Sequence, residues 1–244
     1  MSGPLLFLLV ALIALAGSFV QSTTGFGYAV TCMALWPLLL PFKTATVVEL
    51  ITATFMTVTI AVRYWKFINW RQLVWPCVVA VCTNWVGVQI LQSSTETFLR
   101  RVLGAALMVL AVYFLFFSER LRIRPTRSNG MIAGAVAGLS GGMFSIGGPP
   151  IVAYYLNALE DKREYTATTQ MFFIITTMAL LVMHIRLGNV TREVLRFSAA
   201  AVAGLAVGTG LGLSVFRRLP LTTIKRLVYG FMLGMGLYLS LIHI

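Results

Sequence analysis

The chain has 244 residues, of which 59% are hydrophobic and 11% are charged, and its mean hydropathy is +0.88. An ordinary soluble domain carries roughly 25% charged residues. This composition therefore indicates a polytopic helical membrane protein and excludes a disordered chain, a secreted disulfide scaffold and a cytosolic enzyme. The net charge of +12 comes from Lys and Arg residues in short loops, where such residues orient helices against anionic lipid. We expect the lipid bilayer, and not nucleic acid, to be the partner of these charges.

The apolar runs are of two lengths, and they predict an all-α protein. The first run covers 4–20, and six runs of about twenty residues can each cross roughly 30 Å of hydrocarbon as a helix: 45–64, 72–92, 97–117, 165–185, 194–214 and 222–242. Three shorter runs, at 28–40, 130–142 and 149–158, cover about half a bilayer and predict half-helices. The three cysteines lie inside apolar runs and are expected to be buried thiols, whereas Trp36, Trp65, Trp70 and Trp75 have the positions of an interfacial belt.

The second half of the chain repeats the first. A displacement of 121 positions aligns Ala16-Gly17 with Ala137-Gly138, Gly27 with Gly148, Glu49 with Gln170, Arg71 with Arg192 and Gly87 with Gly208. This correspondence predicts two homologous halves, 1–118 and 130–244, joined by a basic linker at 119–129. Each half then contains one broken helix pair followed by three full transmembrane helices.

The distribution of Lys and Arg favours inverted repeats. If each broken pair is one ordinary span, the loops on the two sides carry 10 and 9 basic residues; if each pair is a re-entrant hairpin, they carry 13 and 6. The positive-inside rule favours the second arrangement. It predicts that both termini lie outside the cytoplasm and that the 119–129 linker lies inside it. The tips of the two hairpins would then meet at mid-membrane.

Two polar, glycine-rich breaks, at 21–27 and 140–150, separate the helices of these pairs. Irregular backbone at membrane depth is tolerated where it packs in protein or lines a cavity, and paired breaks point to a transporter site. The helix starts after the breaks offer N–H groups and a dipole to an anion. The alternative is that these small residues only allow close helix packing. The predicted substrate-binding residues are Gln21, Ser22, Thr23, Thr24, Gly25, Gly27, Ser140, Gly142, Ser145, Gly147, Gly148, Pro149 and Tyr154.

Ionisable groups inside the apolar runs are few, and each costs at least about 2.5 kcal/mol at a helix centre. Glu49 is a candidate to carry a coupled proton or to shape selectivity, with Gln170 as its repeat partner; the alternative is a carboxylate that reaches back to the extracellular interface. Arg63 and His184 form a second repeat-related pair of coupling or gating candidates, for which interfacial anchoring is favoured over substrate contact. Asn84 predicts an interhelical hydrogen bond.

The inventory of reactive side chains does not suit an enzyme. The two histidines, His184 and His243, are far apart in sequence, and no evident base lies near Ser140 or Ser145. Nucleophilic catalysis by serine needs such a base. We expect no catalytic site, no cofactor and no metal.

The motifs Thr24-Gly25-Phe26-Gly27 and Ser145-Ile146-Gly147-Gly148-Pro149-Pro150, together with the duplicated layout, resemble those of the sulfite exporter TauE/SafE family. Many members carry a further glycine where this chain has Tyr28. The resemblance implies a secondary transporter in the bacterial inner membrane that exports small sulfur-containing anions such as sulfite, sulfonates or sulfoacetate. A passive anion channel built on the same breaks and a non-transporting scaffold are the alternatives, and the oligomeric state is left open.

Overall fold

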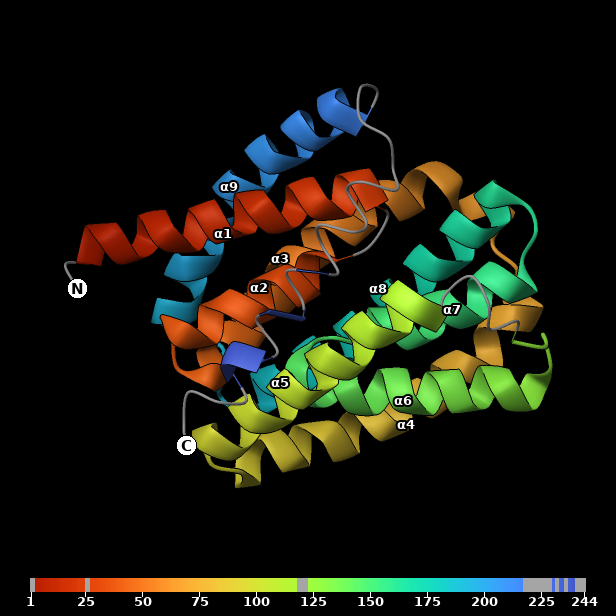
Figure 1. Ribbon diagram of the computed structural model, residues 1–244, viewed down its shortest axis with the longest axis horizontal. Coiled ribbons are helices and arrows are strands. Elements are labelled where there is room, and N and C mark those ends of the chain that lie inside the picture. The colour runs from red at the N-terminus through yellow and green to blue at the C-terminus, as the bar shows by residue number, and fades with distance from the viewer. Residues whose placement is uncertain are drawn as a thin grey trace. The chain divides into compact units, whose positions relative to one another are not determined.

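The computed structural model describes residues 3–24, 27–117 and 123–216, with short stretches between 230 and 239 (Figure 1). These residues form helices and no strands. The helices are α1 Gly3–Thr24, α2 Tyr28–Leu35, α3 Phe42–Tyr64, α4 Trp70–Ser93, α5 Glu96–Val112, α6 Arg127–Phe144, α7 Gly148–Ala158, α8 Lys162–Arg186 and α9 Arg192–Phe216. Single 3₁₀ turns follow α2 and α3 at Trp36–Leu38 and Trp65–Phe67, and a π-helical turn at Tyr113–Phe117 extends α5. The predicted run 222–242 lies largely outside the described residues.

Four helical segments within the described residues are long and apolar enough to cross a membrane: Gly3–Ser22, Trp70–Ser93, Lys162–Arg186 and Arg192–Gly212. The short helices are α2, with 8 residues, and α7, with 11. The prediction of a half-helix at 130–142 is wrong, because α6 has 18 residues. Thr126 caps its start by accepting a hydrogen bond from the Asn129 amide at 3.3 Å, and the helix continues through Phe144.

Two expectations about burial need correction. Cys82 is exposed on α4, whereas Cys32 and Cys77 are buried as predicted. Trp36 is fully buried, not interfacial, because its indole N–H donates to the carbonyl oxygen of Val10 on α1 at 3.3 Å. The other three predicted belt residues, Trp65, Trp70 and Trp75, are exposed.

Both broken pairs fold as antiparallel hairpins. On α1, a Cβ carbon at Gly17 would lie 3.0 Å from the Cys32 sulfur of α2, and Trp36 contacts Val10 further back along α1. In the second pair, Gly147, which precedes α7, lies against the Ala137 carbonyl of α6. Tyr154 of α7 lies against Gly130, seven residues before Ala137 on α6. In each pair, the second helix therefore runs back along the first.

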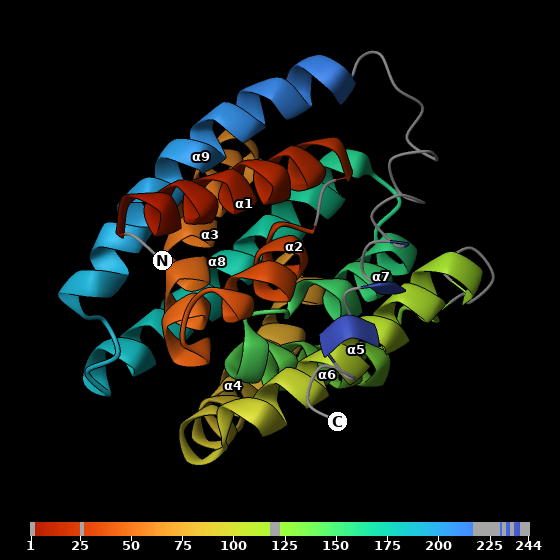
Figure 2. The same cartoon turned by 60° about the vertical axis from the view of Figure 1, so that its left-hand side comes forward.

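The helices form two compact units that each combine segments from both sequence halves. Unit 1 contains 1–52, 94–118 and 189–244, and unit 2 contains 53–93 and 119–188. In unit 1, α9 packs along α1; in unit 2, α4 packs along α6 (Figures 1 and 2). At the displacement of 121 positions α9 aligns with α4 and α6 aligns with α1, so each unit pairs a helix of one sequence half with a helix of the other.

Buried aromatic and aliphatic side chains join the helices of unit 2. Its core contains Leu73, Cys77, Ala80, Ala137, Ile151, Tyr154, Tyr155, Leu159 and Phe172, so α4, α6, α7 and α8 all contribute to one apolar cluster. Many large apolar side chains outside this core stay exposed, among them Trp85 and Ile132. An exposed apolar surface of this kind is expected where lipid, and not water, surrounds the helices.

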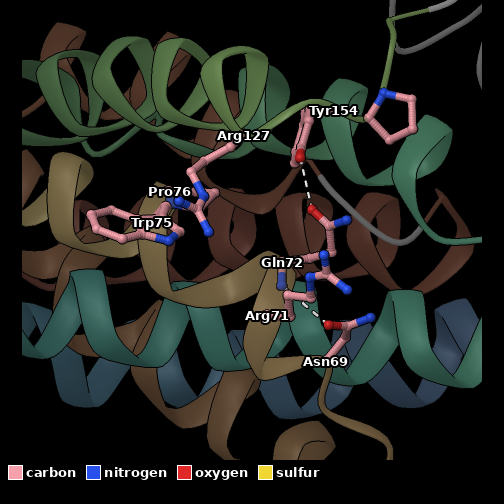
Figure 3. Close-up of a pocket in the computed structure, with 8 residues that line it drawn as sticks. Asn69, Arg71, Gln72, Trp75, Pro76, Arg127 and Tyr154 are labelled. Atoms are coloured by element: carbon pink, nitrogen blue, oxygen red, sulfur yellow. Dashed lines mark hydrogen bonds between the residues drawn. The ribbon is translucent and has the colours of Figure 1, made fainter.

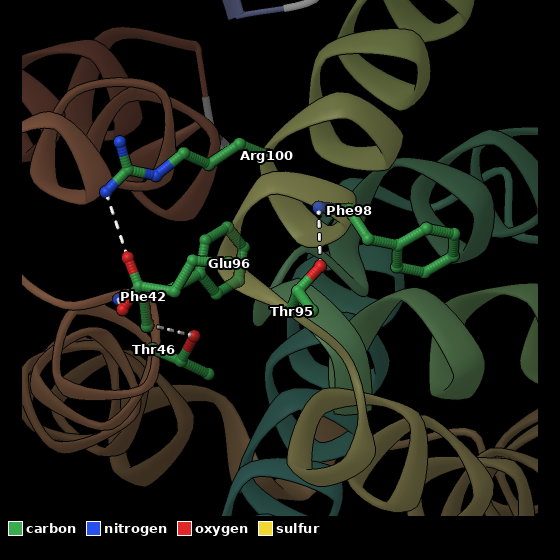
Figure 4. A network of polar contacts seen from close by, with 6 residues as sticks. All are labelled: Phe42, Thr46, Thr95, Glu96, Phe98 and Arg100. Carbon is green, nitrogen blue, oxygen red and sulfur yellow. Dashed lines mark hydrogen bonds and ion pairs between the residues drawn. The ribbon is translucent and has the colours of Figure 1, made fainter. Parts of the chain in front are cut away.

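In unit 1, Glu96 joins the starts of α3 and α5 (Figure 4). Its carboxylate accepts a hydrogen bond from the Phe42 amide at 3.3 Å and pairs with Arg100 at 3.1 Å. Phe42 is the first residue of α3, so its amide has no acceptor within the helix. The negative charge of Glu96 also interacts favourably with the α3 dipole.

Candidate functional site

The first break, between α1 and α2, contains a side-chain cap. Gly27 precedes α2 with φ at 111°, a left-handed conformation that glycine adopts without strain. The Gln21 Oε1 atom accepts a hydrogen bond from the Tyr28 amide at 3.0 Å. Gln21, a predicted substrate ligand, therefore occupies one of the free N–H groups that the prediction assigned to an anion. Gly25 and the side chains of Thr23 and Thr24 lie outside the described residues.

Ser22, the other described polar residue of this break, faces α9. A Cβ carbon at Gly212 of α9 would lie 2.8 Å from the Ser22 Cβ. The Ser22 hydroxyl is buried and has no hydrogen-bond partner among the described residues. It therefore keeps a donor that a bound anion could use.

A buried polar cluster lies behind the first break. The Tyr28 hydroxyl donates to Thr52 Oγ1 at 2.7 Å, and the Thr52 hydroxyl is in turn within 2.8 Å of the Val48 carbonyl on the same helix. Glu49 is 1% exposed, and its main-chain oxygen lies 3.0 Å from the Thr52 hydroxyl. Glu49 is therefore part of the same buried region as Tyr28 and Thr52.

The second break, between α6 and α7, contains one residue with a strained backbone. Ser145 has φ at 58°, a left-handed conformation that costs a non-glycine residue energy. The backbone is held there because the Ser145 amide donates to the Gly141 carbonyl at 2.8 Å and the Ile146 amide donates to the Ser140 carbonyl at 3.4 Å. Ser145 itself is 9% exposed, so the break is packed inside protein.

The start of α7 offers a reduced set of donors. A helix normally leaves four N–H groups unsatisfied at its start, but Pro149 and Pro150 carry none. The remaining donors are the amides of Gly147 and Gly148, which are half-buried between the buried residues Ile146 and Pro149. A Cβ carbon at Gly148 would meet only Phe173, at an ordinary 3.5 Å. Gly148 is therefore open on its Cβ side, whereas Gly147 lies against the Ala137 carbonyl.

Two of the predicted ligands in the second break have structural roles. The Ser140 hydroxyl lies 2.8 Å from the Val136 carbonyl of its own helix; it carries a single proton, which this hydrogen bond uses. Gly142 packs against α4, since a Cβ carbon there would lie 2.9 Å from the Gly87 Cα. The structure therefore agrees, at Gly142, with the alternative that small residues allow close helix packing.

Asn84 of α4 lies beside the second break, which the sequence did not indicate. Its amide nitrogen donates to the Thr176 carbonyl of α8 at 3.3 Å, and this confirms the predicted interhelical hydrogen bond. Its Oδ1 atom is buried and has no partner among the described residues. That oxygen would lie 3.1 Å from a Cβ carbon at Gly141, so Asn84 is close to the second break. In the sequence, the only indication of this residue was a single amide side chain inside an apolar run.

The remaining candidates are dispersed. Gln170 is buried on α8, and its Oε1 has no partner among the described residues. His184 is fully buried, and the Arg63 side chain lies outside the described residues. Tyr154 points away from the break, and its hydroxyl reaches Gln72 of α4 at 2.8 Å.

Within the described residues, no cluster of three or more His, Cys, Asp or Glu side chains could hold a metal ion. The site chemistry found there consists of backbone N–H groups, hydroxyls and amides. Groups of these kinds bind and orient an anion through hydrogen bonds and dipoles, without a fixed charge.

Comparisons with known proteins agree with this description. The family model "Sulfite exporter TauE/SafE" matches residues 9–239. The chain is 27% identical over 253 aligned residues to "Probable sulfite/organosulfonate exporter TauE" of Cupriavidus necator, which covers 99% of this chain and 97% of that relative. No solved structure matches the chain. Because the family match includes both breaks and nearly all the described helices, this multi-pass membrane protein belongs to the sulfite exporter TauE/SafE family, as the sequence motifs indicated.

Proposed function

We propose that this protein is a secondary transporter that exports small sulfur-containing anions such as sulfite, sulfonates or sulfoacetate. The exporter family and the Cupriavidus necator relative support the substrate class. The observation that carries the proposal in this chain is the start of α7, where two half-buried glycine amides follow a packed break. A helix start of this kind attracts negative charge without a positively charged side chain.

In this mechanism the Gly147 and Gly148 amides donate to the anion. The α7 dipole is equivalent to about half a positive charge at the helix start, which offsets part of the cost of removing the anion from water. Such partial charge suits a carrier, because a ligand that is bound moderately is also released. The first break contributes the start of α2, with one amide already capped by Gln21.

We further propose that the two halves are inverted repeats, each a re-entrant hairpin followed by three transmembrane helices, in a bacterial inner membrane. Two observations support this arrangement: α2 and α7 run back along α1 and α6, and equivalent helices of the halves exchange places between units. Inverted repeats are a recurrent architecture of secondary transporters. Rocking of one part against another would then give alternating access.

Flux in proteoliposomes tests the proposal. Purified protein is reconstituted, and uptake of labelled sulfite and a panel of sulfonates is measured with and without an imposed pH gradient. Saturable, competitor-sensitive flux that a proton gradient drives uphill supports a carrier. Flux that only follows the anion gradient and does not saturate would identify a channel instead. No flux of any sulfur anion by folded protein would overturn the substrate class.

A matched pair of variants tests the role of the α7 start. In Gly148→Asp a carboxylate occupies the helix start, where it interacts favourably with the dipole and repels an anion. In Gly148→Asn a neutral side chain of the same shape stands there. We expect flux to be lost in Gly148→Asp and largely retained in Gly148→Asn. Equal flux in the two folded variants would remove the α7 start from the mechanism.

A further inference from the structure

A cavity of about 280 Å³ in unit 2, apart from both breaks, lies beside the first turns of α4 and α6 (Figure 3). Two guanidinium groups line it, from Arg71 of α4 and Arg127 of α6. Uncharged polar side chains and one tryptophan complete the part of the lining that matters here: Asn69, Gln72, Trp75 and Tyr154. None of the described residues that line the cavity is acidic.

The start of α4 is held firmly in place. Asn69 caps it by accepting a hydrogen bond from the Gln72 amide at 3.1 Å. The Asn69 amide in turn donates to Thr168 Oγ1 at 3.0 Å, and its side-chain nitrogen donates to Glu164 at 2.5 Å. These bonds to α8 fix the first turn of α4, which carries Arg71.

Gln72 is also held from α7. Pro76 has no N–H group to give to the Gln72 carbonyl, four residues earlier in α4. The Tyr155 hydroxyl donates to that carbonyl at 3.4 Å, and the Tyr154 hydroxyl contacts the Gln72 side chain at 2.8 Å and the Thr126 carbonyl at 3.2 Å. The cavity therefore has a wall that is formed before any ligand binds.

The two arginines keep their charge available. The Arg127 guanidinium lies 5.0 Å from the centre of the Trp75 ring, a stacking contact that orients it without neutralising it. Neither Arg71 nor Arg127 forms an ion pair with a carboxylate of the described residues. The positive ends of the α4 and α6 dipoles add to the potential in the cavity.

We propose that this cavity binds the oxyanion substrate on the cytoplasmic side and supplies it to the transport path. Guanidinium groups bind two oxygens of a carboxylate or phosphate through two parallel hydrogen bonds, and a sulfonate or sulfite presents a similar pair of oxygens. The cytoplasmic placement rests on the predicted orientation of the 119–129 linker, and the transport role rests on the proposed function. Such a site changes the half-saturating concentration on one face and leaves the equilibrium distribution unchanged.

The other half of the chain does not repeat this site. The positions that correspond to Arg127 and Tyr154 are Leu6 and Met33, and Gln72 corresponds to Glu193. Among the polar and charged lining residues, only Arg71 has a like counterpart, Arg192. In inverted repeats, equivalent positions face opposite sides of the membrane, so the cavity distinguishes one membrane face from the other.

The test measures anion binding by calorimetry with the purified full-length protein and with sulfite and methanesulfonate as probes. Arg71→Gln and Arg127→Gln are expected to weaken binding about tenfold or more, as the loss of a charge-assisted hydrogen bond does. Arg192→Gln, at the equivalent position of α9, is the matched control and should bind like the wild type. Arg71→Lys should recover part of the affinity.

Transport kinetics give the second readout. In vesicles with the cytoplasmic face accessible, Arg71→Gln and Arg127→Gln should raise the half-saturating substrate concentration and leave maximal flux nearly unchanged. Unchanged binding and kinetics in both folded variants would overturn the cavity proposal while the transporter proposal stands. If the wild-type protein binds methanesulfonate through Arg71 but transports no sulfur anion, the transporter proposal fails and the cavity remains an anion-binding site.

A lipid phosphate offers the same chemistry as a free oxyanion. Binding is therefore measured with and without phosphatidylglycerol in the detergent micelle, and bound lipid is quantified after purification. The proposal is supported if the free anion binds in the absence of phosphatidylglycerol and binds with lower affinity in its presence. Retention of phosphatidylglycerol by the wild type but not by Arg71→Gln, with no sulfite binding in either condition, would overturn it in favour of a lipid site.

Discussion

Gly87 of α4 lies directly against the main-chain oxygen of Leu139 on α6, and a Cβ carbon on Gly87 would come within 2.5 Å of that oxygen. Gly208 on α9, which the displacement of 121 positions aligns with Gly87, lies against the main-chain oxygen of Leu15 and the hydroxyl of Ser18 on α1. Ser18 corresponds to Leu139 at the same displacement of 121 positions. In both contacts, a glycine of one sequence half packs closely against a helix of the other half.

Gly87→Ala should destabilise the protein. The new methyl group would also lie 2.8 Å from the Gly142 Cα and 2.9 Å from the Met143 nitrogen. Backbone on both sides cannot move aside easily, so overpacking should cost about 1–3 kcal/mol. The measurement is the thermal unfolding midpoint in detergent.

Gly210→Ala is the matched control for this prediction, because a Cβ carbon at Gly210 meets nothing within 4 Å. It should leave the unfolding midpoint unchanged or slightly raised, since alanine favours a helix more than glycine does. An equal decrease for Gly87→Ala and Gly210→Ala would mean that close approach of α4 and α6 is not the cause.

The start of α8 should respond to acid through Asp161. The pKa of this carboxyl lies below its ordinary value of 3.8 because it accepts hydrogen bonds from the amides of Glu164 and Arg163. A lowered pKa in the folded state stabilises the helix start above the ordinary value, and this contribution is lost as the pH falls through the folded pKa. We therefore expect faster amide exchange at Arg163 and Glu164 below pH 3.8 than above it, after correction for intrinsic rates.

Asp161→Asn provides the comparison for this pH effect. Asparagine is also a good N-cap but does not titrate, so the pH-dependent part of the exchange at these two amides should disappear. Persistence of the same pH dependence in Asp161→Asn would show that another group controls the start of α8.

Glu49→Gln tests the predicted coupling role. The side chain keeps its shape but no longer ionises, so flux should lose its response to an imposed proton gradient while downhill flux continues. Glu96→Gln is the control, because Glu96 joins α3 to α5 through Phe42 and Arg100 and has no assigned part in coupling. A gradient response that survives in Glu49→Gln would exclude Glu49 as the proton carrier.

The orientation of the chain is open to a direct test. A reporter fused to the C-terminus should register outside the cytoplasm, and one inserted in the 119–129 linker should register inside it. These outcomes follow from the positive-inside distribution of Lys and Arg with two re-entrant hairpins. A cytoplasmic C-terminal reporter would contradict the inverted-repeat topology.

Part of the fold could be read directly from the residues. The apolar lengths predicted membrane-spanning helices at 72–92, 165–185 and 194–214, where the structure has α4, α8 and α9. The short runs at 28–40 and 149–158 correctly marked the short helices α2 and α7. The prediction for 130–142 was wrong because the polar residues of the first turn, Arg127–Asn129, belong to α6, and a polar helix end resembles a loop in a hydropathy pattern.

The candidate site was predictable in position but not in role. Glycine and proline predicted both breaks, because their effect on the backbone is local. Whether a polar side chain near a break is free depends on its neighbours in space: Gln21 caps Tyr28, Ser140 bonds within its own helix, and Asn84 reaches the second break from α4. None of these pairings has a signature in the order of residues.

The sequence by itself determined the membrane class and the places where the helices break, because hydrophobicity acts over one bilayer thickness and backbone restrictions act over one turn. The tertiary structure alone decided that α4 packs on α6 and α9 on α1, and that Arg71 and Arg127 share a cavity. These arrangements depend on shape and hydrogen bonding between residues that are far apart in the chain. Such contacts become visible only when the helices are packed together.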